Sequence, residues 1–409
     1  ATLAKPVLVY DGACGFCCYW VARWRRRTRG AVAFVPFQSL DVQSTDNAAL
    51  RDVPRSDFVR AVHFFEPDGT VSDGARAVAR LVAWSAGSEG RHWLGHLLTA
   101  LYDYLPGASW CGERAYRTVA DHRAAAMQVT RWLWGSEPGA SHYAQTAWVF
   151  RRWLGLVYVL AFGSLFGQVV GLIGEQGILP VRSYLQAVEA VADGQAFGLE
   201  RFHLLPTLVW LNPSDAFLRG LCILGVILGL LLIAGAAPGV TLWALWGTYL
   251  SLVVAGGDFM TFQWDGLLLE AGLLAACWAP GVVWDRWRAA REPSWLGVWG
   301  VRWLLFRLMF GAGIIKIASG DPSWRNLTAL AAHYGTQPLP TPLAWYASQL
   351  PLAVHRVCTA ATLAIQLGAP WLIVAPRRAR AFAGLLLAGL EILIALTGNY
   401  GFFNFVSIA

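Results

Sequence analysis

The sequence predicts a small α/β domain at the N-terminus, followed by an α-helical bundle of about seven membrane spans. Of the 409 residues, 56% are hydrophobic and only 14% are charged, whereas about a quarter of the residues in a soluble domain are charged. The chain also has 22 Trp residues, and indole rings gather where a protein meets the membrane interface. Strand and helix patterns alternate before residue 128, and long apolar stretches begin after residue 150.

The α/β domain covers residues 1–127 in this prediction. Its strand patterns lie at residues 7–10, 32–37, 62–65 and 70–71. The last two flank a Pro-Asp-Gly turn, which is typical of a hairpin. Helical patterns occupy residues 14–27, 75–84 and, in pieces, 92–125. We expect no secretory signal before the first strand, because the preceding segment is too short to hold one.

The membrane domain covers residues 151–409, after an interfacial linker at 128–150. Its apolar stretches are close to the length of about 20 residues that crosses a bilayer. We place the spans at residues 153–174, 217–236, 240–257, 263–284, 299–318, 357–375 and 380–398.

Arginine placement predicts the orientation of these spans. Arg clusters at 151–152, 286–302 and 377–380 fall on one side if the spans alternate. Because positive charge favours the cytoplasmic side, we expect the N-terminal domain to be cytoplasmic, at a bacterial inner membrane. The long connections 175–216 and 319–356 are then external.

Charge and cysteine content argue against two other classes: a nucleic-acid-binding protein and a small protein held together by a framework of disulfides. The net charge is +7, and the Arg-rich stretch 23–29 could suggest nucleic acid. In a membrane protein a solvated helix face or contact with anionic headgroups is the better interpretation, so we expect no nucleic-acid partner. The chain has seven Cys, and Cys222, Cys277 and Cys358 lie in apolar stretches, where Cys behaves as a small hydrophobe.

A dithiol lies between the first strand and the first helix. Cys14 and Cys17 form a Cys-x-x-Cys motif at the start of the helical pattern, where the helix N-terminus favours the reactive thiolate. By position, Cys14 is the exposed nucleophile and Cys17 the resolving thiol. Asp11 could accept or relay a proton, or it could serve only the turn beside Gly12.

Two alternatives to redox chemistry stay open for this pair. A structural zinc site needs four ligands, and Cys18, Cys111 and the scattered His residues lack paired spacing. We therefore expect no metal. The pair could also be structural or vestigial.

Ionisable side chains inside predicted spans mark a second region of interest: Asp265, Glu270, Arg307, Lys316 and Glu391. Such groups are costly in hydrocarbon and usually face a partner or a wet cavity. Lys316 stands out because the chain has only one other Lys, Lys5, and an ammonium can lose its proton when buried, which a guanidinium cannot.

The predicted topology brings several polar residues to the external side. We hypothesise an outward-facing polar site formed by Asp265, Lys316, His333, Tyr334, Gln337 and Asn399. The alternative is a structural Asp265–Lys316 pair that holds two helices together. Glu270 and Arg307 lie deeper and are interpreted as a structural pair. The Pro-rich segment 337–342 predicts a rigid loop, and residues 181–192 predict an amphipathic helix on the outer surface.

The N-terminal motif resembles a known family. Asp11, Cys14 and Cys17 match the signature of DCC-family thiol-disulfide oxidoreductases, together with segments 34–39, 74–78 and 116–117. The resemblance implies a thioredoxin-like fold and a redox-active Cys14–Cys17 disulfide that needs no cofactor. The sequence departs from the thioredoxin-like pattern twice: Cys18 adds a third thiol, and no Pro immediately precedes Val62.

The membrane part resembles lipase maturation factors. The stretches that carry the resemblance are 164–174, 177–180, 262–272, 306–316, 333–346 and 399–404. Members of that family are multi-span membrane proteins, in animals resident in the endoplasmic reticulum, that are needed for secreted lipases to fold. They are distantly similar to vitamin K-dependent carboxylases, and they continue past the point that matches Ala409.

The sequence therefore favours a membrane-anchored thiol-disulfide oxidoreductase linked to maturation of lipase-like or other secreted clients. Its expected partners are membrane lipid and either a client protein or a partner thiol protein. One alternative is a membrane enzyme with an external site around Lys316 that acts on a bound lipid or quinone. Another is a non-catalytic scaffold or chaperone. The sequence does not indicate the oligomeric state.

Overall fold

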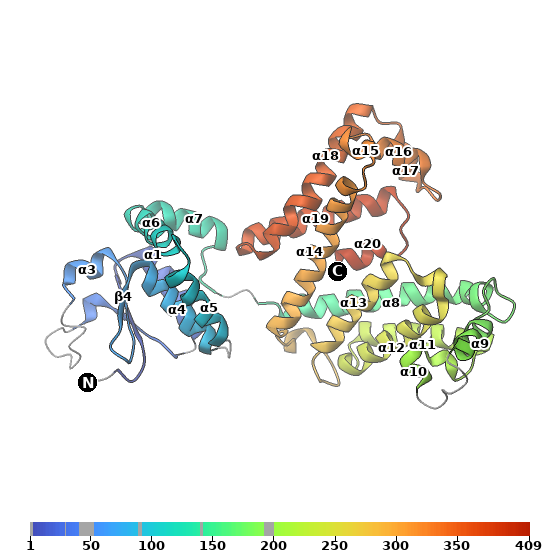
Figure 1. Ribbon diagram of the computed structural model, residues 1–409, viewed down its shortest axis with the longest axis horizontal. Coiled ribbons are helices and arrows are strands. Elements are labelled where there is room, and N and C mark those ends of the chain that lie inside the picture. Colours follow the sequence, from blue (N-terminus) through green and yellow to red (C-terminus); the bar gives the residue numbers. More distant parts are fainter. Residues whose placement is uncertain (1–2, 29, 41–52, 89–91, 140–141, 192–199) are drawn as a thin grey trace. The chain divides into compact units, whose positions relative to one another are not determined.

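A computed structural model describes residues 3–28, 30–40, 53–88, 92–139, 142–191 and 200–409 (Figure 1). The chain folds as two compact units: residues 1–141 together with 376–378, and residues 142–375 together with 379–409. We describe each unit by itself.

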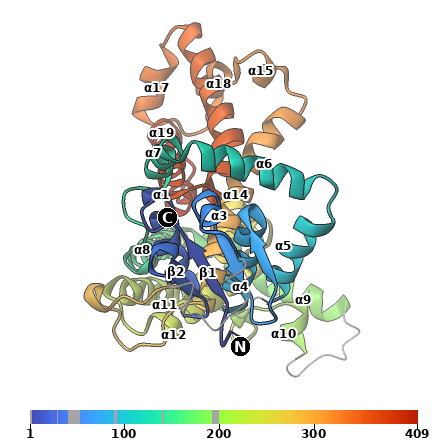
Figure 2. The ribbon, with the colours of Figure 1, turned by 90° about the vertical axis from the view of Figure 1, so that its left-hand side faces the viewer.

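The first unit is built on a four-stranded sheet. Its strands are β1 (Val7–Tyr10), β2 (Ala33–Pro36), β3 (His63–Phe65) and β4 (Val71–Asp73), in the spatial order β2-β1-β3-β4. β1 and β2 run parallel, whereas β3 is antiparallel to both β1 and β4. This is the predicted thioredoxin-like arrangement, with its crossover helix between β1 and β2 (Figures 1 and 2).

Helices cover both faces of this sheet. The helices of this unit are α1 (Gly15–Thr28), α3 (Arg55–Arg60), α4 (Gly74–Ser88), α5 (His92–Tyr104), α6 (Ala108–Asp121) and α7 (Arg123–Trp134), with a short 3₁₀ turn η1 (Phe37–Ser39) after β2. Leu8 and Phe64 pack with α1 and α4 in one core, and Val9 packs with Phe58 of α3 in another. Successive residues of β1 thus enter opposite cores, as the period-two geometry of a strand requires.

The second unit begins with a group of helices around one large core. They are α8 (Ala144–Ile173), α9 (Val181–Val191), α10 (Arg201–Leu204), η2 (Leu208–Trp210), α11 (Asp215–Ala234), α12 (Pro238–Gly256), η3 (Gly257–Met260), α13 (Gln263–Cys277) and, from the end of the chain, α20 (Phe403–Ile408). Much of residues 128–150, expected as a linker, is helical, because α7 and α8 extend into it.

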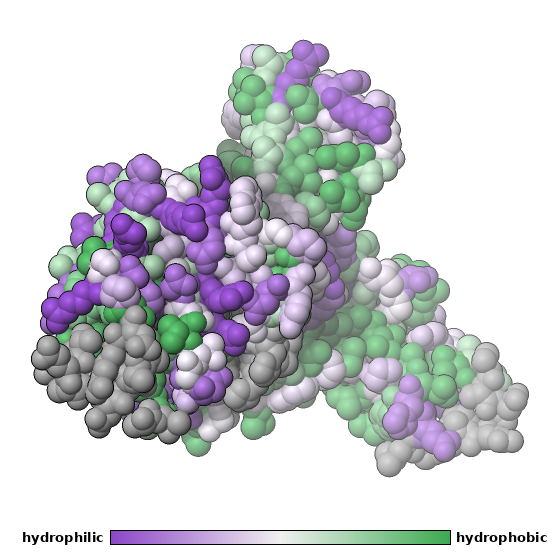
Figure 3. All heavy atoms as spheres, turned by 60° about the vertical axis from the view of Figure 1, so that its left-hand side comes forward, coloured by the Kyte–Doolittle hydropathy of each residue, from purple (hydrophilic) through white to green (hydrophobic). Residues whose placement is uncertain are grey.

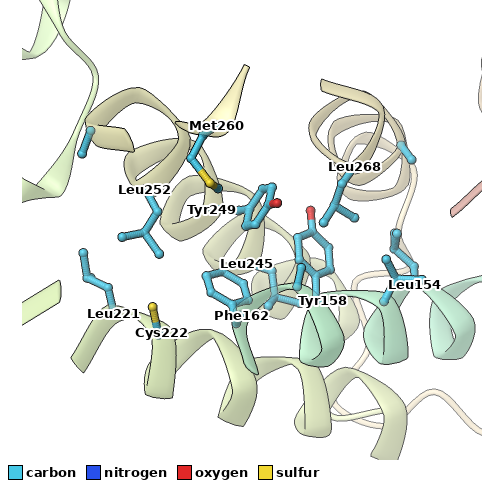
Figure 4. Packing of buried hydrophobic residues seen from close by; sticks show 14 of the residues in the cluster. Leu154, Tyr158, Phe162, Leu221, Cys222, Leu245, Tyr249, Leu252, Met260 and Leu268 are labelled. Atoms are coloured by element: carbon cyan, nitrogen blue, oxygen red, sulfur yellow. The ribbon is translucent and has the colours of Figure 1, made fainter. Parts of the chain in front are cut away.

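Tyr158, Phe162 and Tyr249 interdigitate at the centre of this core (Figure 4). A Cβ at Gly225 would lie 2.3 Å from the Phe162 ring, so only glycine lets α11 approach α8 so closely. The amphipathic α9 buries Val181 and Leu185 in the same core.

A second group of helices follows in the same unit. It consists of η4 (Trp287–Ala289), α14 (Trp295–Ala318), α15 (Pro322–Arg325), α16 (Ala329–Thr336), α17 (Pro342–Ser348), α18 (Leu352–Gly368), η5 (Ala369–Val374) and α19 (Arg377–Thr397). Met309, Ala369 and Leu387 form the buried centre where α14, η5 and α19 meet.

Six helices in the described part of the chain are long and apolar enough to cross a membrane: Ala144–Ile173, Asp215–Ala234, Pro238–Met260, Trp295–Ala318, Leu352–Val374 and Arg377–Thr397. Many of their exposed residues are apolar, and hydrophobic residues cover much of the second unit on the face drawn in Figure 3. The protein is therefore an integral membrane protein.

The remaining predicted span, 263–284, contains α13, which has only 15 residues. Phe259 and Met260, just before α13, line a small cavity together with Val169 and Ile173 at the C-terminal end of α8. Beyond α13, Trp278 stacks on Phe150 at a centroid distance of 5.9 Å, near the N-terminal end of α8. The chain thus passes from one end of α8 to the other through α13 and the non-helical residues that follow, which gives about seven traversals with six long helices.

Candidate functional site

Cys14 and Cys17 lie where β1 gives way to α1. Cys14 directly precedes the helix and Cys17 lies in its first turn. The backbone N–H of Cys17 donates a hydrogen bond to Sγ of Cys14 at 3.3 Å, and both residues are free thiols. A donor at a helix N-terminus stabilises negative charge on the sulfur it faces. The geometry suits Cys14 as a nucleophile.

Both thiols of the pair are half-buried, and Cys17 packs against the core between the sheet, α1 and α4. Burial raises its pKa well above the ordinary value, and its hydrogen bond and charge interaction with Cys14 raise the pKa further. The charge of Arg123 acts in the opposite direction. Cys17 is therefore held as a protonated thiol at neutral pH, as a resolving cysteine would be before it attacks.

Asp11 holds the turn in front of the dithiol. Its Oδ1 accepts hydrogen bonds from the Ala13 N–H at 3.0 Å and from Nε2 of Gln38 at 2.7 Å. Its Oδ2 lies 3.5 Å from Nη1 of Arg123. Both oxygens are engaged, so these contacts support the turn role that was one of the two interpretations. A Cβ at Gly12 would lie 2.7 Å from the Pro36 side chain, which explains glycine at that position.

The two departures from the thioredoxin-like pattern have local explanations. The Cys18 thiol donates to the Gly12 carbonyl at 3.2 Å, and burial raises its pKa. At the start of β3, Val62 donates its N–H to Oη of Tyr116 at 2.9 Å. Among the described residues no peptide bond is cis. A tyrosine from α6 thus holds the segment that a proline would occupy.

Tyr116 and Arg123 are site residues that local sequence reasoning missed. The sequence indicated Tyr116 only as part of segment 116–117, which resembles the DCC family. No sequence pattern indicated Arg123. Their partners Val62 and Asp11 lie 54 and 112 positions earlier in the chain, and no local pattern reports such contacts.

In the membrane unit, Asp265 lies in the first turn of α13 and is 2% exposed. Oη of Tyr249 on α12 donates to its Oδ1 at 2.5 Å. Lys316 lies in the last turn of α14, donates to the Ala312 carbonyl at 3.1 Å, and interacts electrostatically with Glu391 of α19.

The structural Asp265–Lys316 pair, which was one of the two interpretations, is therefore wrong for the part of the chain that the structure describes, where no ion pair joins the two side chains. The topology placed both residues near one end of their helices, but it did not determine which face each residue occupies. Asp265 faces α12, whereas the Lys316 ammonium lies 5.3 Å from the Trp324 ring centroid.

The external-loop residues form a cluster of their own. Nε2 of Gln337 donates to the Thr397 carbonyl at 2.9 Å and lies 2.8 Å from Nε2 of His333. Oη of Tyr400 lies 3.3 Å from the same His333 nitrogen, and the Tyr334 ring lies 5.6 Å from the His333 ring. Because a carbonyl only accepts, the Gln337 amide nitrogen is a donor, so His333 is neutral and accepts at Nε2. Burial lowers the pKa of His333. Asn399 is exposed beside this cluster.

Glu270 of α13 and Arg307 of α14 form an ion pair. Their side chains are 45% and 54% exposed, so the pair lies on the helix surface rather than in the core.

One buried cluster of charged side chains was not predicted from the sequence. Arg151 donates from Nε and Nη2 to Oδ2 of Asp285 at 2.9 and 2.7 Å, and Nη1 of Arg152 donates to the same oxygen at 2.5 Å. The Arg152 guanidinium also lies 4.1 Å from the Trp148 ring centroid. This cluster fastens the segment after α13 to the start of α8.

No three His, Cys, Asp or Glu side chains gather closely enough to hold a metal ion within the described ranges. The dithiol chemistry needs none, since thiol-disulfide exchange proceeds between sulfur atoms alone.

Fold and site together define a multi-span membrane protein that carries a thioredoxin-like dithiol domain. Residues 8–129 match the family described as DCC1-like thiol-disulfide oxidoreductase. Residues 145–409 match the family described as lipase maturation factor transmembrane domain. The chain belongs to the lipase maturation factor family.

Curated relatives agree with this assignment. Lipase maturation factor 2 of Xenopus laevis is 42% identical over 262 residues, which cover 62% of this chain and 36% of the relative. Lipase maturation factor 2 of Gallus gallus is 43% identical over 270 residues, covering 64% and 37%. Lipase maturation factor 1 of Bos taurus is 37% identical over 273 residues, covering 65% and 48%. The matches thus span between a third and a half of the relatives' length, and no solved structure matches the chain.

Proposed function

We propose that the protein is a membrane-anchored thiol-disulfide oxidoreductase that serves the maturation of lipase-like or other secreted clients. The observation that carries the redox part is the Cys17 N–H donated to Sγ of Cys14 at the N-terminus of α1. The name of the relatives, lipase maturation factor, supports the choice of client.

The proposed reaction is thiol-disulfide exchange in two steps. The Cys14 thiolate attacks one sulfur of a client disulfide, which forms a Cys14–client mixed disulfide and releases the other client sulfur as a thiolate. Cys17 then loses its proton to solvent and attacks Sγ of Cys14, which forms the Cys14–Cys17 disulfide and releases the second client thiolate. Two electrons pass from the protein to the client, and the reverse sequence oxidises a client dithiol.

We further propose that the domain faces the cytoplasm at a bacterial inner membrane. Contacts inside the second unit support a common positive end: Oη of Tyr143 accepts from Arg302 at 2.6 Å, and the Tyr143 ring lies 5.9 Å from the Arg380 guanidinium. Arg151 and Arg152 of α8 form ion pairs with Asp285, which lies in the segment between α13 and α14. Positive charge at one end favours the cytoplasmic side. Labelling of Cys14 by an impermeant thiol reagent in intact cells would contradict this orientation.

Trapping in cells tests the proposed activity. In Cys17→Ser the mixed disulfide cannot be resolved, so a covalent adduct should accumulate that disappears on reduction. Cys14→Ser/Cys17→Ser should give no adduct, and Cys18→Ser should behave like the parent. An adduct that persists without Cys14 would refute the assigned roles.

A membrane enzyme around Lys316 is the second candidate, with a lipid or quinone as its ligand. Two observations favour it: Lys316 interacts electrostatically with the buried carboxyl group of Glu391, and His333 accepts a hydrogen bond from Gln337. Loss of client maturation in Lys316→Ala, with full retention in Cys14→Ser, would select this function. Retention in both variants would indicate a scaffold.

A further inference from the structure

Arg123, the first residue of α7, connects three parts of the dithiol domain. Its Nη2 donates to the carbonyls of Val59 and Arg60 at 2.7 and 2.9 Å, at the C-terminal end of α3. Its Nη1 lies 3.5 Å from Oδ2 of Asp11. Its side chain is only 25% exposed. Because both of its terminal nitrogens have partners, this guanidinium is fixed in position.

The surroundings of Cys17 give this fixed charge a chemical consequence. The titratable groups that interact with Cys17 are Cys14 and Asp11 from the turn, Tyr116 from α6 and Arg123 from α7. Cys14, Asp11 and burial all oppose ionisation of Cys17, and within the described residues Arg123 is the positive charge that favours it. Cys17 must ionise before it can attack, because the thiolate is the nucleophile.

We propose that Arg123 is a positioning residue of the dithiol: it holds the Asp11 turn against α3 and supplies the positive charge that lets Cys17 resolve a mixed disulfide. The proposal rests on the proposed exchange chemistry and adds a determinant of its second step. Arg123 acts on the dithiol through its contact with Asp11 and through its charge.

Reaction with the aromatic disulfide dithiobis(nitrobenzoate) separates the attack by Cys14 from the resolution by Cys17. The Cys14 thiolate attacks the reagent, releases one thionitrobenzoate and forms a Cys14–thionitrobenzoate disulfide. Cys17 then loses a proton to solvent and attacks Sγ of Cys14, which releases the second thionitrobenzoate and leaves the Cys14–Cys17 disulfide. The Cys17→Ser variant stops after the first release. The thionitrobenzoate that the parent releases in excess of this variant therefore measures the second step, without the contribution of the other cysteines.

The experiment uses the full chain in lipid nanodiscs and follows both releases between pH 6 and 10. In Arg123→Gln the second release should slow about tenfold at pH 8, with its pH profile moved upward by about one unit. The first release should change less than twofold. Arg123→Lys retains the charge but loses the two-pronged hydrogen bonding, so it should recover at least half of the shift. Arg117→Gln, an exposed Arg of α6, is the matched control and should resemble the parent.

An unchanged second-step profile in Arg123→Gln would overturn the proposal. So would a shift of the same size in Arg123→Lys, because the effect would then come from lost packing rather than lost charge. The readout needs no client, so it is separable from the proposed function. Absence of trapped client with an intact Arg123 effect would refute the client role alone.

Discussion

Asp285 offers the sharpest test of how the membrane unit is held together. Asp285 is 6% exposed as a residue, and its carboxylate pairs with Arg151 and Arg152, which are 1% and 9% exposed. Asp285→Asn keeps the size of the side chain but leaves two buried guanidinium groups without a counter-charge. Removing one partner of a buried ion pair costs about 3–5 kcal/mol. We expect a loss of that size in the free energy of unfolding.

A matched control lies on the same interhelical segment. Glu292 pairs with His142, but these side chains are 49% and 78% exposed, so Glu292→Gln should cost at most about 1 kcal/mol. Equilibrium unfolding of the full chain in mixed micelles, followed by tryptophan fluorescence, measures both variants. Adding Arg151→Gln to Asp285→Asn removes one unpaired charge and should recover part of the loss, so the two substitutions should be non-additive.

Equal costs for Asp285→Asn and Glu292→Gln would refute the reasoning. Strict additivity of the Arg151 and Asp285 substitutions would refute it as well. Either result would mean that the segment after α13 is held to α8 by something other than this charge cluster.

Two further predictions concern the dithiol domain and the helix core. Burial raises the pKa of Cys17 above its ordinary value of 9.0, so the folded protein keeps a proton that the unfolded chain releases; stability should fall above about pH 9 by at most about 1.4 kcal/mol per pH unit. Cys17→Ser should flatten this decline in denaturation midpoints, and an unaltered slope would contradict the assignment. Gly225→Ala should lower stability by about 1–3 kcal/mol, because its Cβ would lie 2.3 Å from the Phe162 ring, whereas Gly220 of the same helix faces open space. Equal melting temperatures for Gly225→Ala and Gly220→Ala would exclude this close contact.

The dithiol was predictable because its determinants are local. A strand, a turn and a helix start follow one another within residues 7–17, and each has a short-range signature. The role of Cys17 follows from its place in the first helical turn. Arg123 and Tyr116 were not predictable, because they reach the dithiol from helices that follow the sheet in sequence.

The long apolar helices were predictable, but the direction of their side chains was not. Apolar length located six long helices, and the Arg clusters matched residues that share contacts at one end of the bundle. Hydropathy cannot determine which helix face a residue occupies, so one of the two interpretations paired Asp265 with Lys316, whereas the structure pairs Asp265 with Tyr249. Asp285 lies directly after the predicted span 263–284, in a segment whose sequence indicated only a loop between helices, so its burial was not predictable.

Reversible formation of a Cys14–Cys17 disulfide is the central claim, and a redox titration tests it most directly. The full chain in nanodiscs is equilibrated in glutathione buffers of graded potential, alkylated, digested and analysed by mass spectrometry for the peptide that contains Cys14, Cys17 and Cys18. We predict a two-electron transition in which Cys14 and Cys17 lose their free thiols together while Cys18 remains alkylated. A peptide that stays fully reduced at every potential, or a disulfide that uses Cys18 in place of Cys17, would contradict the account.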